Sequence, residues 1–586
     1  MFDDDSLLTA NKEFFTKDGS IQKIFTTDAF MKNDKTFYRP LQNLSFLIDV
    51  KISGSMDARM FHITNVLLFS LIAFSLYFLL LKFNISHLYA FFGTLLYSAH
   101  PLFISSASWI PARGDLLLTL FSILSFIWGI RFLEKKKYSA LIITWLCFTL
   151  ALFSKETAML LPVLFLIYFL TFNPKPKIDF KVIVLGFLLL CTATVWYFLR
   201  NLSITDSDLN LTVSNFLYNL LAIPVSLAMF AVPYNFSTVP EYTLTKILIG
   251  CVLLVLTVVL MVKNTSQPRK KKIFFLLWFL LLLIPTFFAK TKEWDYLDHR
   301  FLLPLIGILA LTLLHIQSKS KRKVIPVLAL ITAVFSILTI FNSQAFSNPV
   351  TFYEAMKHNK NKPDTYYFLK GNVEQISGKL DNALQSYSAA IAHNPEHFRA
   401  LNNSGIIKQT KGDLKGALTD YNSAIDLGLK NYSIFKNRGT VRMKLNDYDG
   451  AIQDFESALE LEHQAEIYYL RGIIYLTLEQ EENALEDFNR YFSENPVNPE
   501  IYTDIGIIFG KKGDIEKSIN CFTKAIEADS TYTMAYYNRA FAEYISSDYT
   551  QALSDCNKSL AIDSLYQNAQ ILKKEVEKSI KENEIQ

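Results

Sequence analysis

The sequence has few cysteines and lacks several motifs that mark common classes of enzyme. Its five cysteines, in a chain of 586 residues, form no Cys-x-x-Cys pair and no spacing typical of metal ligands. It contains neither a glycine-rich nucleotide-binding loop nor a cluster of histidine and cysteine. The first 30 residues lack a basic start and an apolar core, so no signal peptide is predicted. We therefore expect buried apolar thiols, no bound metal and no cofactor.

Long apolar runs fill one part of the chain and are missing from the other. The sequence is 51% apolar and contains 48 phenylalanines. Residues 58–341 hold successive apolar runs of about 15 to 22 residues, close to the ~20 that span a bilayer as a helix. Residues 364–586 hold no such run. This break predicts a multi-span membrane domain at 58–341, a linker at 342–363 and a soluble domain after it.

The apolar runs predict ten spans and one further segment. The ten are 60–82, 87–106, 115–133, 139–153, 157–172, 182–199, 245–262, 273–289, 301–316 and 324–341. The further segment, 216–233, contains Pro224 and Pro233.

The charges of the loops set the predicted orientation. Most Lys and Arg of the membrane domain lie in four loops, which read RFLEKKKYS, NPKPKIDFK, KNTSQPRKKK and QSKSKRK. The positive-inside rule places these loops in the cytoplasm. The alternation holds only if 216–233 does not cross, so this segment is predicted to be re-entrant or interfacial. Both chain ends then face away from the cytoplasm.

The C-terminal part repeats every 33 or 34 residues, six times within 364–566. A small residue opens the pattern, a second small residue follows twelve positions on, and an aromatic side chain comes four positions later in five of the repeats. The first small residues are Gly371, Gly405, Gly439, Gly472, Gly506 and Ala540, and the aromatic ones are Tyr387, Tyr421, Phe455, Phe488 and Phe522. These columns are typical of the tetratricopeptide (TPR) repeat, a helix-pair solenoid. Residues 567–586 read as a polar capping helix and tail. The predicted fold class is therefore all-α: a transmembrane helical bundle followed by a TPR α-solenoid.

One polar column of the repeats is a candidate for binding an extended acceptor peptide in the solenoid groove. It contains Asn403, Asn437, Asp504 and Asn538, two positions before the small residue. The alternative is that these are ordinary polar residues of a helix surface. Phe368 and Ser433 stand where carboxylate-clamp TPR proteins carry basic residues, so a receptor for chaperone tails is not favoured.

Ionisable residues on the predicted exterior side carry the candidate membrane site. They are Arg39, His62, His100, Arg113, Asp115, Lys155, Glu156 and Arg300. Ionisable groups near membrane depth are costly and mark functional sites. Taken singly, the arginines could be interfacial anchors, Lys155 and Glu156 a surface pair, and His100 a satisfied histidine at a kink. Taken together they predict a carboxylate base beside a cationic clamp for an anion, for which Arg is suited to phosphate.

The N-terminal 57 residues form a predicted exterior loop that begins with the acidic cluster Asp3, Asp4 and Asp5. Its segment FYRPLQNLSFLIDV is predicted to lie on the membrane surface as an amphipathic stretch. Composition alone also allows a solvated, frayed terminus for the three acids.

The order of these motifs resembles a known family. DDD…N, YRPL, FHxxN, HP…WIxxRxD, SKE and HRFLLP, followed by TPR repeats, are similar to the TMTC-type membrane proteins and their bacterial TPR-containing relatives, which are glycosyltransferases of the GT-C class. The resemblance implies inverting transfer of a sugar, typically mannose, from a polyprenyl-phosphate carrier to a protein Ser or Thr. It assigns catalysis to the acids, here Asp4 and Asp5 with Asp3 beside them, and Asn11 completes their motif.

The remaining roles follow from this resemblance and from the chemistry of phosphate. Arg300, Arg113, Lys155 and Arg39 are expected to bind the donor phosphate, with His62, His100, Asp115 and Glu156 in support. The TPR repeats are expected to hold the acceptor protein. The sequence departs from the family at Ser105, where an acid is usual, and at Phe69, where a second histidine is common. The family also has a transmembrane helix before the acidic motif, so we expect one upstream of Met1, which would make eleven spans.

Two other functions stay open at this point. One is a non-enzymatic, membrane-anchored TPR scaffold, although a scaffold needs one span and not ten. The other is a transporter or export subunit, although the ionisable groups gather at one side and do not line a midplane path. The expected location is a bacterial inner membrane with a periplasmic TPR domain, or an endoplasmic reticulum membrane with a lumenal one. No nucleic-acid partner is expected.

Overall fold

The computed structural model is helical throughout the residues it describes, which are 14–27, 37–173, 178–203, 213–233, 243–262, 268–287, 298–344, 349–356, 364–494 and 498–585. The chain divides into two compact units, Met1–Leu369 and Lys370–Gln586. The predicted all-α fold class is confirmed: an N-terminal region of apolar helices is followed by TPR helical repeats.

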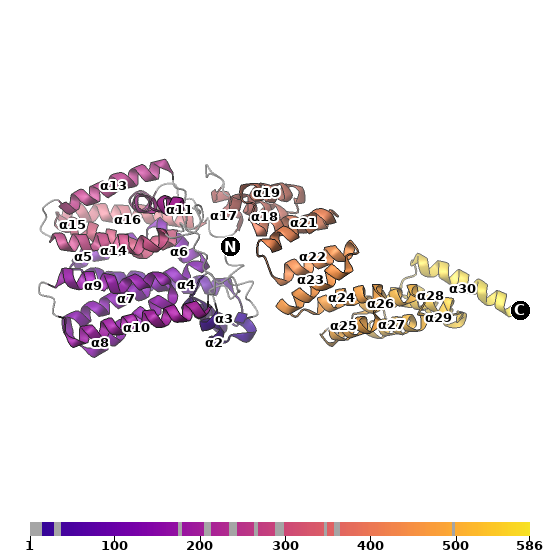
Figure 1. The fold of residues 1–586 in the computed structure, drawn as a ribbon. Helices are drawn as coiled ribbons and strands as arrows, with labels where there is room; N and C mark the ends of the chain where they lie inside the picture. Colours follow the sequence, from indigo (N-terminus) through magenta and orange to yellow (C-terminus); the bar gives the residue numbers. More distant parts are fainter. Residues whose placement is uncertain are drawn as a thin grey trace. The chain divides into compact units, whose positions relative to one another are not determined.

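The first unit is a bundle of apolar helices joined by short connections (Figure 1). In the described part of the chain its elements are η2 (Phe14–Asp18), α2 (Ile21–Thr26), α3 (Pro40–Ser53), α4 (Ala58–Lys82), α5 (His87–Ser98), η3 (Pro101–Phe103), α6 (Ile104–Ser108), η4 (Ile110–Ala112), α7 (Arg113–Lys135), α8 (Tyr138–Ser154), η5 (Glu156–Leu160), α9 (Leu161–Phe172), α10 (Phe180–Ser203), α11 (Val213–Asn219), α12 (Ala222–Ala231), α13 (Leu244–Val262), α14 (Arg269–Phe287), η6 (Asp298–Phe301), α15 (Leu302–Ile316), α16 (Lys321–Ser343) and α17 (Pro349–Met356).

Four helical segments of the described residues are long and apolar enough to cross a bilayer. They are α4, Ile110–Lys135, α10 and α16, and the pair formed by α5 with η3 and α6 is a fifth if its 53° bend lies within one span. The other five predicted spans coincide with helices α8, α9, α13, α14 and α15. Four of these five are among the shorter apolar helices, and α14 begins with four basic residues. The protein is therefore a multi-pass membrane protein, and the full number of ten spans stays a prediction.

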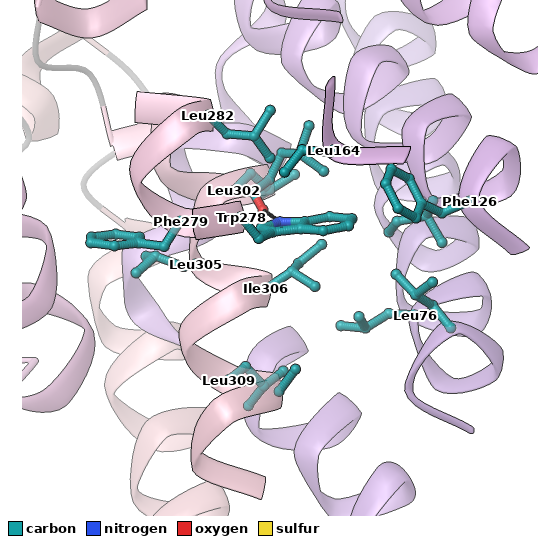
Figure 2. Packing of buried hydrophobic residues seen from close by; sticks show 14 of the residues in the cluster. Leu76, Phe126, Leu164, Trp278, Phe279, Leu282, Leu302, Leu305, Ile306 and Leu309 are labelled. Atoms are coloured by element: carbon teal, nitrogen blue, oxygen red, sulfur yellow. Dashed lines mark hydrogen bonds between the residues drawn. The ribbon is translucent and has the colours of Figure 1, made fainter. Parts of the chain in front are cut away.

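Trp278 of α14 joins two halves of the bundle core (Figure 2). Its ring lies beside Ile306 of α15 and contacts Phe126 of α7, with 4.7 Å between the ring centroids. The indole Nε1–H donates to the carbonyl of Leu303 at 3.0 Å, so the polar edge of this fully buried side chain is satisfied. This packing holds α14 and α15 against α7.

The four basic loops meet at one end of the bundle. Lys181 donates to the carbonyl of Lys136, which joins the loop before α8 to the loop before α10. Lys271, at the start of α14, lies over the ring of Phe172 at the end of α9. Gln317 accepts from the backbone N–H of Ser86, which brings the loop before α16 to the same end. The alternation read from the loop charges thus agrees with the helix packing.

Segment 216–233 begins and finishes at the opposite end. Phe216 packs on Phe287 at the end of α14, and Phe230 stacks on His100 at the end of α5. The helix between them, α12, has ten residues and is therefore only ~15 Å long, half the bilayer thickness. This packing agrees with the prediction that the segment does not cross.

Helix α3 is placed at that same end by its sequence. Pro40 stands at the first helical position, and Gly54 ends the helix with a φ of 70°. Its apolar face packs Phe46 and Leu47 with Phe15 and Phe61 in a small core of its own. Figure 1 shows α2 and α3 near one end of the neighbouring helices α7, α8 and α10.

The second unit continues the TPR helix pairs that begin with α18, and Figure 1 shows its helices following one another in pairs. The helices are α18 (Asp364–Ile376), α19 (Leu380–His393), α20 (Phe398–Thr410), α21 (Leu414–Asp426), α22 (Tyr432–Lys444), α23 (Tyr448–Leu461), α24 (Ala465–Thr477), α25 (Glu481–Glu494), α26 (Pro499–Lys511), α27 (Ile515–Ala528), α28 (Thr533–Ile545), α29 (Tyr549–Ile562) and the single α30 (Gln567–Ile585). In five pairs the aromatic ring lies against the glycine of the first helix. A Cβ added at Gly405, for example, would lie 2.7 Å from the ring of Tyr421. The columns read from the sequence are therefore the contacts that close each helix pair.

Candidate functional site

The predicted catalytic acids lie outside the described residues. Asp3, Asp4, Asp5 and Asn11 all belong to this part of the chain, so their predicted roles stay predictions. The described candidates gather at the end of the bundle that holds α3, the start of α7 and the end of α8.

Lys155 and Asp115 form a buried ion pair. Asp115 lies in the first turn of α7, and Lys155 follows the last residue of α8 in an extended conformation, with φ −164° and ψ 142°. The ammonium group of Lys155 donates to both carboxylate oxygens of Asp115, each at 2.7 Å. Both side chains are nearly enclosed, with exposed fractions of 8% and 6%. A pair this buried is held together by mutual attraction and by charge-assisted hydrogen bonds.

Arg39 and Glu156 form a second pair beside the first. Arg39 precedes α3, and its guanidinium lies 3.5 Å from the Glu156 carboxylate and over the ring of Phe37. Glu156 follows Lys155 directly and opens η5. The Nε–H of Arg39 is buried and has no hydrogen-bond partner among the described residues. One donor of this arginine thus remains unused.

The electrostatics of Lys155 bring Arg300 into the same cluster. Burial lowers the pKa of Lys155 from its ordinary value of 10.5 to about 8, although Asp115 acts in the opposite direction. The positive charges of Arg39 and Arg300 lower this pKa further. Three cations and two carboxylates therefore act on one another here, with a net charge of +1. We call these five residues, Arg39, Asp115, Lys155, Glu156 and Arg300, the charged cluster.

Arg113 turns away from this cluster into a network of its own. Its Nη1 donates to Asp49 at 2.5 Å, its Nε to Asn65 at 2.7 Å and its Nη2 to the carbonyl of Phe61 at 2.6 Å. The side chain is 0% exposed and lies over the ring of Phe46. Because each nitrogen already donates to a protein group, the geometry favours a structural role for Arg113. Its predicted role in binding phosphate is not carried further.

Asp49 and Asn65 are the partners that sequence reasoning missed as candidates. Asp49 also accepts from the Thr64 hydroxyl at 2.8 Å, and Asn65 donates to the carbonyl of Trp109 at 3.2 Å. A signal was present, because an aspartate on the apolar face of an amphipathic segment needs a partner. Its partner lies 64 residues further along the chain, which no local pattern reveals.

His100 is held by structural contacts, and His62 is not part of the charged cluster's printed geometry. The Nδ1 of His100 accepts from the backbone N–H of Leu102, so its Nε2–H donates to the carbonyl of Phe230 at 2.9 Å. The ring stacks on Phe230 and is 1% exposed. His62 lies half-buried in the first turn of α4, directly after Phe61. Neither contact set shows how these histidines would support a donor site, so that role stays a prediction.

The TPR column residues differ from one another in their surroundings. Asn403 donates to Asn372 at 3.1 Å and to the Tyr387 hydroxyl at 3.3 Å. Asp504 is exposed and accepts from the Tyr469 hydroxyl at 3.1 Å. Asn437 and Asn538 are half-buried. The predicted role of this column in acceptor binding stays a prediction.

Arg–Asp pairs across the TPR helices were not singled out from the sequence. An arginine directly before the small residue reaches an aspartate sixteen positions on, in the third, fourth and sixth repeats. The pairs are Arg438–Asp454, Arg471–Asp487 and Arg539–Asp555. Each aspartate is at most 3% exposed, and each receives two parallel N–H donors. The fixed spacing of sixteen was the signal that could have found them.

Comparison with protein families gives matches to both units. Residues 47–198 match the family described as dolichyl-phosphate-mannose-protein mannosyltransferase. Residues 368–431, 436–499 and 499–532 match models of the tetratricopeptide repeat. The first match includes Asp49, Arg113, Asp115, Lys155 and Glu156.

Solved structures similar to parts of this chain are tetratricopeptide proteins. A repeat protein from Parabacteroides merdae is 24% identical, covers 38% of this chain and 88% of its own, and has a TM-score of 0.32. YrrB, described as a TPR protein with an unusual peptide-binding site, is 23% identical, covers 32% and 97%, and has a TM-score of 0.26. PilF of Pseudomonas aeruginosa is 16% identical, covers 36% and 97%, and has a TM-score of 0.29.

Proposed function

The chain combines a domain of the dolichyl-phosphate-mannose-protein mannosyltransferase family with C-terminal TPR repeats, and from this premise we propose how the glycosyltransferase works. We propose that it transfers a mannose-like sugar from a polyprenyl-phosphate donor to the hydroxyl of a protein Ser or Thr. The donor class follows from the family, while the protein acceptor and the inverting course are part of the proposal.

The charged cluster is the observation that supports a donor-phosphate site. Arg39, Lys155 and Arg300 come from three separate stretches of the chain and act on one another at one end of the bundle. Their two carboxylate neighbours leave a net positive charge, which an entering phosphate would balance. Buried cations act on an anion more strongly than exposed ones, because little water screens them. We assign the phosphate to Arg39, Arg300 and Lys155.

The proposed reaction is a single displacement at the anomeric carbon of the sugar. Asp4 or Asp5 takes the proton of the acceptor hydroxyl, whose oxygen forms the new bond to this carbon. The bond between the carbon and the phosphate oxygen breaks, and its electron pair stays on the polyprenyl phosphate. The negative charge that grows on this leaving group is stabilised by the phosphate-binding cations. The products are a glycosylated hydroxyl and a free polyprenyl phosphate, with inversion at the anomeric carbon.

The TPR repeats are proposed to hold the acceptor protein beside the site. This requires the repeats to lie on the same side of the membrane as the charged cluster, which we propose is the periplasmic side of a bacterial inner membrane. Asn403, Asn437, Asp504 and Asn538 are the proposed polar contacts with an extended acceptor segment.

The test is transfer of radiolabelled sugar from polyprenyl-phosphate mannose to protein in membranes that contain the full chain. We expect transfer by the wild type and its loss in the Asp4→Asn/Asp5→Asn variant, at equal amounts of inserted protein. Arg59→Gln, at an ion pair exposed to solvent, serves as a charge-changing control that keeps activity. Absence of transfer by the wild type with mannose and glucose donors would contradict the enzyme. It would leave the membrane-anchored scaffold as the better account.

A further inference from the structure

Two buried amides on α3 have polar atoms without partners. Gln42 and Asn43 are 2% and 1% exposed. Among the described residues the side-chain oxygen of Gln42, and both the oxygen and the nitrogen of Asn43, have no hydrogen-bond partner. Buried polar groups in native proteins are almost always paired, so three such atoms on adjacent residues require an explanation.

These atoms share a helix face with the unused donor of Arg39. Residues three and four apart on a helix are neighbours, which places Gln42 and Asn43 above Arg39. The same face continues to Asp49, one turn beyond Phe46, and Asp49 is fully paired with Arg113 and Thr64. The lack of partners is therefore confined to the start of α3, next to the charged cluster.

Gly114 brings Gln42 close to that cluster. A Cβ added at Gly114 would lie 2.5 Å from the side-chain oxygen of Gln42 and 3.5 Å from the carbonyl of Ser154. Gly114 precedes Asp115, and Ser154 precedes Lys155. The Gln42 amide thus lies at the junction of the first turn of α7 and the end of α8, where the Lys155–Asp115 pair is formed. Any larger residue at position 114 would collide with it.

We infer that Gln42 and Asn43 form the subsite that binds the hydroxyl groups of the donor sugar. A sugar hydroxyl both donates and accepts, and a primary amide offers an acceptor oxygen and a donor nitrogen. A neutral amide pair beside a cationic phosphate site matches the two parts of a polyprenyl-phosphate sugar. This inference rests on the proposed function and names the residues that determine its donor specificity.

The test uses two substitutions that keep size and remove polarity, Gln42→Met and Asn43→Leu, in the full chain in detergent. Thermal unfolding is followed without ligand, with polyprenyl phosphate, and with polyprenyl-phosphate mannose. In the wild type we expect the sugar-bearing ligand to raise the midpoint more than polyprenyl phosphate does. In each variant we expect this sugar-dependent part to disappear, while the shift caused by polyprenyl phosphate remains.

The ligand-free midpoint separates binding from structure. Because the replaced atoms have no protein partner, apolar side chains of similar size should leave the midpoint unchanged or raise it. Ser45→Ala is the matched control on the same helix, since the Ser45 hydroxyl donates only to the backbone carbonyl of Gln42 in the described structure. It should keep the sugar-dependent shift. If one amide variant fails to fold, the other still tests the inference.

Transfer kinetics give the second measurement. We expect kcat/KM for the mannose donor to fall by roughly tenfold for each hydrogen bond lost, with the preference for mannose over the glucose donor reduced. A sugar-dependent shift and donor preference unchanged in both variants would overturn the inference and would assign the amides to buried water. A wild type that binds the sugar ligand through these amides but transfers nothing would contradict the proposed function alone.

Discussion

At the scale of single residues, the most consequential side chain that the structure relocates is Arg113. In the sequence it stands in WIPARGD and is one cation of a convergent set. In the fold it joins α3, α4 and α7 through Asp49, Asn65 and the carbonyl of Phe61. Its charge is used to hold α3 against the bundle, and α3 in turn carries Arg39 to the charged cluster. The residue thus acts on the site by positioning.

We predict that Arg113→Leu destabilises the protein strongly, by about 3–5 kcal/mol, because it leaves Asp49 buried without its ion partner. The measurement is the free energy of unfolding in detergent. Asp49→Asn/Arg113→Leu should recover part of the loss, since no unpaired charge then remains. A single variant as stable as the wild type would show that the buried pair contributes nothing to stability.

The pKa of Lys155 predicts an alkaline limit of activity. Burial lowers this pKa to about 8, so the ammonium that is proposed to bind phosphate loses its proton above that pH. We expect the transfer rate to fall between pH 8 and 9. In Lys155→Arg the guanidinium stays charged, so any activity that remains should lack this alkaline fall. The same fall in both proteins would exclude Lys155 as its origin.

The sign of the linked stability change separates this effect from unfolding. The folded chain loses the Lys155 proton near pH 8, whereas the unfolded chain keeps it until about its ordinary value of 10.5. The unfolded state therefore binds more protons in this window, and this group makes the fold more stable as the pH rises. Loss of activity between pH 8 and 9 with an unchanged or raised unfolding midpoint would agree with titration of Lys155.

At the scale of helices, the TPR pairs show why the pattern could be read from the sequence. The contact that closes each pair joins residues sixteen apart, a glycine of the first helix and an aromatic side chain of the second. Four second helices begin after an aspartate whose carboxylate accepts from the backbone of the first turn, at Asp413, Asp447, Asp514 and Asp548. Both signals are local, so the helix pairs follow from the sequence alone.

The sixth repeat provides a test of this packing. There Ala540 takes the place of glycine, and Cys556 takes the place of the aromatic side chain, and both are fully buried. We predict that Cys556→Phe destabilises this repeat by about 1–3 kcal/mol, because the ring collides with the methyl group of Ala540. Adding Ala540→Gly should restore most of the loss, as measured by limited proteolysis of the C-terminal repeats. Equal destabilisation in the single and double variants would contradict the pairing of these positions.

At the scale of the whole molecule, helix packing and loop charge agree on two ends of the bundle. The basic loops meet at one end through contacts such as Lys181 with Lys136, and the charged cluster lies at the other. We predict that the TPR repeats lie on the side of the charged cluster, opposite the basic loops.

Cysteine labelling measures this orientation. With the five native cysteines replaced by alanine, Lys574→Cys in α30 and Ser55→Cys before α4 should react with a membrane-impermeant reagent in intact cells stripped of their outer barrier. Lys319→Cys, in the loop before α16, should react only after permeabilisation. All three positions are exposed. Labelling of Lys574→Cys and Lys319→Cys from the same side would contradict the predicted topology.

The sequence by itself determined the helical fold class, the position of the apolar helices, the TPR repeats and the set of ionisable residues at one side of the membrane. These features follow from periodicity, apolar length and charge, which act between residues near in the chain. Only the tertiary structure decided how the ionisable set divides. It paired Lys155 with Asp115 and Arg39 with Glu156, gave Arg113 to Asp49, and left Gln42 and Asn43 without partners. The reason is that a buried charge or amide takes its partner from whatever helix packs against it, and these helices lie 40 to more than 100 residues apart in the chain.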